Sequence, residues 1–124
     1  MDTEETQLAS DLANLNTPSS ARKLIHAETH STQEKKTGFC LSNVTGRYKV
    51  GELVVRGQIT KEKDDDDRLS DLNIKVIAYS EDGEIVGNEY DSVDFNENSV
   101  IEVFEVKVKC DHEPVKLLVF PLYM

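Results

Sequence analysis

Apolar and polar residues alternate along much of the chain after residue 38, with the period of two that is typical of β-strands. The alternation is clearest in residues 53–60, LVVRGQIT, and 72–79, LNIKVIAY. The positions expected to face a core are Leu53, Val55, Gly57, Ile59, Leu72, Ile74, Val76 and Ala78. The second segment leads into Asp82-Gly83, which predicts a hairpin because glycine adopts positive φ without a Cβ clash.

Further strands are predicted over residues 39–44, 84–95, 100–110 and 115–124. In the third of these, the inward set shifts from Ile101 and Val103 to Phe104, Val106 and Val108. Such a shift predicts a bulge or a bend between sheets. The last segment, VKLLVFPLYM, is apolar on both faces. It predicts a strand buried on both sides, with Pro121 ending its pairing.

Six or seven strands with no helix between them indicate an all-β domain over residues 38–124. We expect an immunoglobulin-like β-sandwich of antiparallel strands, and a small β-barrel is the alternative. The chain of 124 residues has the length of one domain with one modest core.

Residues 1–37 differ from the rest because they are polar and carry few large apolar side chains. We expect a flexible polar arm with transient helix, since so little apolar surface cannot offset chain entropy. Within it, Leu8, Leu12 and Leu15 share one face at helical spacing, so a short motif that folds on a partner is the alternative. A second short helical pattern begins at Thr17-Pro18 and includes Leu24 and Ile25.

The charge of the chain limits its partners. Fourteen Lys and Arg face twenty-four Asp and Glu, for a net charge of −10, which disfavours nucleic acid and anionic membrane surfaces. No apolar stretch has the length of a membrane span, and no leader is visible, so we expect a cytoplasmic protein unless the sequence is a mature form. We expect Cys40 and Cys110 to be free thiols in that compartment, and a disulfide between them is the alternative.

The order of these segments resembles the FxLYD domain, a small immunoglobulin-like β-sandwich of unassigned activity. The resemblance covers about residues 50–109 and rests on Gly57, Tyr79, Asp82-Gly83 and Phe104. It implies a sandwich fold with an adhesion or scaffolding role, and it transfers no catalytic residue.

Two sites with metal-binding composition occur. In HAETH, His26 and His30 have the spacing of metal ligands on a helix, but Glu28 would point away and no third ligand lies nearby, so we expect a solvated pair. Asp64, Asp65, Asp66 and Asp67 supply oxygen ligands of the kind that calcium prefers. Consecutive aspartates without a glycine do not converge on one ion, so a solvated loop is the simpler expectation, with a calcium-dependent binding domain as the alternative.

Enzymatic chemistry has little support in the sequence. No nucleophile elbow, phosphate loop or dinucleotide fingerprint is present, which leaves a thiol enzyme using Cys110 or Cys40 as the least favoured hypothesis. We therefore expect no catalytic residues and no cofactor. The prediction is a non-catalytic module that binds a protein partner through a sheet edge or loops, with the outward Glu and Lys residues of 100–109 marking such an edge.

Overall fold

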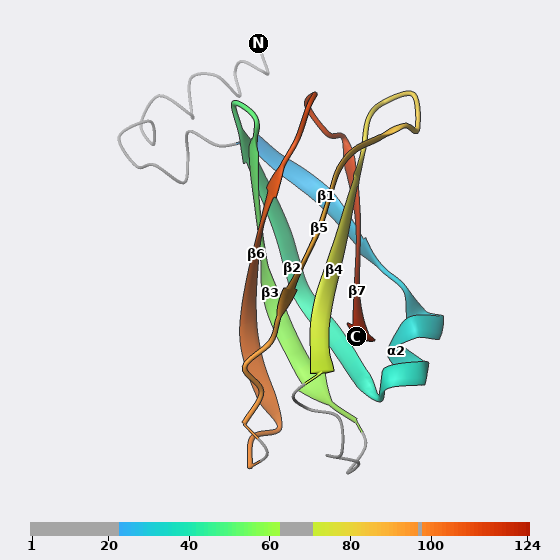
Figure 1. Cartoon of the computed structure of the whole chain (residues 1–124), viewed down its shortest axis with the longest axis vertical. Coiled ribbons are helices and arrows are strands. Elements are labelled where there is room, and N and C mark those ends of the chain that lie inside the picture. Colours follow the sequence, from blue (N-terminus) through green and yellow to red (C-terminus); the bar gives the residue numbers. More distant parts are fainter. Residues whose placement is uncertain (1–22, 63–70, 97) are drawn as a thin grey trace.

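The computed structural model describes residues 23–62, 71–96 and 98–124 (Figure 1). Its elements are β1 (Lys23–Thr29), α2 (Ser31–Thr37), β2 (Phe39–Lys49), β3 (Glu52–Lys61), β4 (Leu72–Tyr79), β5 (Ile85–Ser92), β6 (Ile101–Lys109) and β7 (Lys116–Tyr123). The expected all-β fold is confirmed.

The seven strands form one mixed sheet in the order β5-β4-β7-β1-β2-β3-β6, which is nearly closed into a barrel. All neighbouring strands are antiparallel except β1 and β7, which are parallel. Strand β1 joins the two halves, because Lys23–Ile25 pair with β2 and His26–Thr29 pair with β7. This shared strand gives the fold features of both a sandwich and a barrel.

The folded unit begins before residue 38, which corrects the expected domain boundary. Ile25 is 3% exposed in the core, and helix α2 contacts β2 and β7. Residues 23–37 therefore belong to the domain, since pairing with distant strands fixes a segment whose own sequence predicts no strand. The second predicted helix is wrong where it includes Leu24 and Ile25. The first part of the arm expected over residues 1–37, residues 1–22, lies outside the described residues.

The predicted strand phases in β3 and β4 are confirmed, because their inward apolar side chains are buried. Gly46 of β2 also faces the interior, where a Cβ would lie 2.3 Å from Cδ1 of Leu117. A side chain at this position would displace Leu117 of β7, which is fully buried. The close approach of β2 to β7 therefore requires glycine at position 46.

The predicted Asp82-Gly83 turn is present before β5, and a second turn follows β5. Gly83 has φ +85°, and its N–H donates to the Ser80 carbonyl over 3.0 Å, which closes the β4–β5 hairpin. On the other side of β5, the Ser99 N–H donates to the Asn96 carbonyl over 2.9 Å. The hairpin confirms that Asp82-Gly83 was a strong local signal.

Two strand details differ from the sequence expectations. Pro121 does not end the pairing of β7, which continues along β4 to Tyr123. Proline is tolerated there because β1 pairs only as far as Val119, so no ladder bond is lost on that side. The bulge expected in β6 is also wrong, since its register with β3 is continuous and Ile101 and Val103 are exposed.

Candidate functional site

Strands β5 and β6 form the two ends of the sheet and lie next to each other. No strand ladder between them is found in the described residues, but the Asp111 N–H donates to the Val86 carbonyl over 2.9 Å. At the same end, a Cβ on Gly87 would lie 2.8 Å from Sγ of Cys110. The two edges are thus joined at one end by a hydrogen bond and close packing.

The backbone groups of alternate β6 residues point away from β3. Lys61 N–H donates to the Val100 carbonyl over 2.8 Å, and Cys110 N–H donates to the Gly51 carbonyl over 2.9 Å. Hydrogen-bonded positions alternate in an antiparallel pair, so the even-numbered residues between these two bonds face β3. The N–H and carbonyl groups of Ile101, Val103 and Glu105 therefore lie along the outer edge of the sheet.

Two apolar side chains mark the first half of this edge. Val103 is 74% exposed and Ile101 is 49% exposed, and both project from the outer face of β6. Their register partners in β3, Gln58 and Thr60, are polar. We call Ile101, Val103 and the backbone edge from 101 to 105 the β6 edge site.

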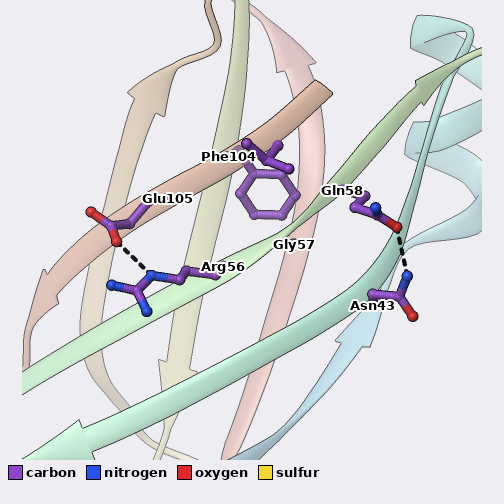
Figure 2. A pocket seen from close by; sticks show the side chains of 7 residues that line it. Asn43, Arg56, Gly57, Gln58, Phe104 and Glu105 are labelled. Atoms are coloured by element: carbon purple, nitrogen blue, oxygen red, sulfur yellow. Dashed lines mark hydrogen bonds and ion pairs between the residues drawn. The ribbon is translucent and has the colours of Figure 1, made fainter. Parts of the chain in front are cut away.

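A shallow groove adjoins the β6 edge site on the outer face (Figure 2). Nε of Arg56 donates to Oε2 of Glu105 over 2.6 Å, and Nδ2 of Asn43 donates to Oε1 of Gln58 over 2.6 Å. Figure 2 shows these two polar pairs on either side of Gly57. The groove thus offers polar groups beside the exposed valine.

Two backbone features form this groove. Strand β2 changes register between Ser42 and Thr45, and Asn43 there has φ +53°, a conformation that asparagine tolerates better than most residues. In β3, Gly57 has no side chain, so the ring of Phe104 packs over it, and a Cβ at Gly57 would lie 2.7 Å from Cζ. Both Asn43 and Gly57 line the groove.

His26 and His30 do not lie on one helix. His26 and Glu28 lie on strand β1, where Nε2 and Oε2 are 3.6 Å apart at the surface. His30 instead caps helix α2, accepting the Gln33 N–H on Nδ1 over 3.2 Å. The helical spacing assumed for the pair is therefore wrong, because a strand ends between them. His112 lies in the segment between β6 and β7, which begins after Lys109.

Neither cysteine has the environment of a reactive thiolate. Burial raises the pKa of the Cys110 thiol, and the Asp111 carboxylate raises it further. Burial also raises the pKa of Cys40, with added contributions from Glu34 and Glu62. The pKa of Cys110 is raised although Lys107 and Lys109 lie close to it in the sequence. Both thiols are free in the structure.

Other predicted sites lie outside the described residues, namely Asp64, Asp65, Asp66, Asp67, Leu8, Leu12 and Leu15. Within residues 23–62, 71–96 and 98–124, no group of three or more metal-ligating side chains is present. No helix in those same ranges is long and apolar enough to cross a membrane.

Sequence reasoning identified β6 as an edge strand but missed its exposed valine and isoleucine. It placed Ile101 and Val103 inside because both are apolar. The signal was available, because Glu105, Lys107 and Lys109 define the outward phase, and continuing that phase backwards leads to Val103 and Ile101. Because these two residues are apolar, they suggested a change of phase, although the inward–outward alternation of β6 is the same along its whole length.

No family model and no curated protein matches the sequence. Among solved structures, the chain is similar to one described as a beta-galactosidase from Bacteroides fragilis, with 12% identity and a TM-score of 0.34. The similarity covers 70% of this chain but 16% of that chain, so this chain spans a small part of its length. A likeness of this size carries no argument about function.

Proposed function

We propose that the domain is a non-catalytic protein-interaction module that binds an extended segment of a partner through the β6 edge site. The supporting observation is a backbone edge that has no ladder partner among the described strands, together with a valine that is 74% exposed on it. An added strand satisfies the edge N–H and carbonyl groups, and side-chain contacts with Val103 and Ile101 select the partner.

The resemblance to FxLYD domains belongs to the same proposal, because it implies a scaffolding or adhesion role on an immunoglobulin-like sandwich. The absence of a reactive thiolate at Cys40 and Cys110 also favours binding over catalysis, since raised pKa values keep both thiols protonated near neutral pH. Binding through an edge needs no cofactor.

A proline substitution tests the edge directly. Val103→Pro removes an N–H that points away from β3, so the ladder between β3 and β6 is retained while the outer edge loses a donor. The matched control is Tyr90→Pro, because Tyr90 lies at a non-bonded position of the other end strand. Circular dichroism first verifies that both full-length variants are folded.

Affinity capture with the full chain then separates the outcomes. Proteins retained by the wild type and by Tyr90→Pro, but lost with Val103→Pro and with Val103→Lys, support the β6 edge site. Retention by all variants would refute it. Loss on adding a calcium chelator, with no effect of the β6 variants, would instead favour the calcium-dependent alternative at Asp64–Asp67.

A further inference from the structure

The outer face of β2, β3 and β6 collects basic side chains in a chain of net charge −10. The cross-strand register places them in adjacent rows, which run Arg47–Val54–Lys107, Lys49–Glu52–Lys109 and Thr45–Arg56–Glu105. We call this surface the basic face, and its basic members are Arg47, Lys49, Arg56, Lys107 and Lys109. Of its two acids, Glu105 is already bonded to Arg56.

The basic face is a local exception in the charge distribution. It carries five Lys and Arg against two Asp and Glu, whereas the remaining described residues carry six against thirteen. Charge of one sign gathered on one face attracts segments of the opposite sign and orients them. The occupant of this face is therefore expected to be acidic.

The basic face also offers apolar contact. Leu24 of β1 continues the row of Arg47, Val54 and Lys107, and it is 61% exposed. Val54 lies between Arg47 and Lys107 and is 9% exposed. Its low exposure is consistent with cover by the aliphatic parts of these two long side chains. An occupant with both carboxylates and leucines is complementary to this surface.

We propose that residues 2–15 of the same chain dock on the basic face. This segment contains Asp2, Glu4, Glu5 and Asp11, and no Lys or Arg precedes Arg22. It also contains Leu8, Leu12 and Leu15, the motif whose spacing indicates one apolar face. Both complementary features are present in one segment.

The attachment point brings the segment to the basic face. Strand β1 begins at Lys23, which pairs with Tyr48 next to Lys49. The far strand β6 is three strands from β1, or about 14 Å. The twelve residues from Asp11 to Lys23 span about 18 Å as a helix and at most about 40 Å when extended. Either conformation is therefore long enough for the segment to reach β6. Covalent attachment also raises the local concentration to the millimolar range, which makes weak contacts effective.

Zero-length carbodiimide cross-linking of the full chain, which joins a carboxylate to a lysine amine, tests the contact. In the monomer fraction at about 0.02 M salt, mass spectrometry should find links from Glu4, Glu5 or Asp11 mainly to Lys49, Lys107 and Lys109. These links should fall about fivefold or more at about 0.5 M salt, where screening is strong. Lys75 and Lys116, which lie on β4 and β7, are the internal controls.

A charge variant supplies a second readout by NMR. Glu4→Gln, Glu5→Gln and Asp11→Asn together should shift backbone amide signals of Val54 and Lys107, and the control Asp64→Asn, Asp65→Asn and Asp66→Asn should not. Cross-links spread evenly over all lysines, or found only in a covalent dimer, would overturn the proposal. Amide shifts confined to β4 and β5 would also overturn it.

Discussion

The two end strands of the sheet, β5 and β6, differ in the side chains that occupy their inward positions. In β5, Glu89 and Asp91 are exposed although their register partners in β4, Val76 and Ile74, are fully buried. In β6, three inward positions hold buried apolar side chains, namely Phe104, Val106 and Val108, and the fourth holds Glu102, whose register partner Ile59 is fully buried. Charge therefore occupies two inward positions of β5 and one inward position of β6, whose other inward positions are core.

The difference supports the proposal that the two edges have different roles. Inward-pointing charge is one way in which proteins prevent an edge from pairing with other chains, and β5 has it at two positions. Strand β6 has Lys107 and Lys109 on its second half, but its first half presents Ile101 and Val103. The first half of β6, which has one inward charge at Glu102 and two exposed apolar side chains, is the edge on which the proposed function depends.

The largest expected effect comes from placing a charge on the buried face of β6. Val106→Asp puts a carboxylate at a position where the side chain is 1% exposed. The resulting loss in the free energy of unfolding should exceed the whole stability of a small domain, roughly 5 kcal/mol, so the variant should be unfolded. Glu89→Ala on β5 should change stability by about 0.5 kcal/mol or less. Urea unfolding monitored by circular dichroism checks both, and a cooperative transition for Val106→Asp would contradict the assigned phase of β6.

Truncating one aromatic residue on each end strand gives the next effect. Phe104→Ala empties the space over Gly57 and should destabilise the domain by about 3–5 kcal/mol. Tyr90 is exposed and contacts Lys75, whose Nζ lies 5.5 Å from the ring centroid, so Tyr90→Ala should destabilise by about 1 kcal/mol or less. Equal unfolding midpoints for the two variants would refute the contrast between the edges.

Sequence pattern predicted the strands whose residues alternate strictly. The strict alternation in residues 72–79 shows which side chains of β4 face inward, and Asp82-Gly83 specifies the hairpin that follows. Both signals lie within the segment itself. Strand β1 was missed since Ile25 is its only buried side chain and its pairing partners, β2 and β7, are distant in sequence. One buried residue produces no alternation to detect.

The candidate site depends on information that the local pattern does not contain. Whether Val103 is buried depends on which strands lie beside β6 and what covers its outer face. Sequence reasoning treated apolar residues as core, which is right for central strands and wrong for this end of the sheet. The groove was missed for a similar reason, because it arises from a register change in β2 opposite a glycine in β3.

A smaller effect comes from the end at which the two edges meet. A Cβ at Gly87 would lie 3.0 Å from the Lys109 carbonyl oxygen and 2.8 Å from Sγ of Cys110, so Gly87→Ala must push β5 and β6 apart. We expect a loss of about 1–3 kcal/mol and faster alkylation of Cys110 by iodoacetamide. The control Asn88→Ala, one residue further along β5, should leave both measurements near the wild-type values. Unchanged alkylation in Gly87→Ala would mean that this contact does not hold the edges together.

The smallest effect concerns the protonation of Cys110 at the same junction. Its pKa is raised in the folded state, by burial first and then by Asp111, so folding favours the neutral thiol. The corresponding stability is fully present below the unfolded pKa of about 8.5 and is lost as pH rises through the higher folded-state pKa. Cys110→Ala removes this group and adds a packing defect that does not depend on pH. The stability difference between wild type and Cys110→Ala, measured by urea unfolding, should therefore narrow between about pH 7 and pH 10. A constant difference would show that Cys110 titrates alike in the folded and unfolded chain.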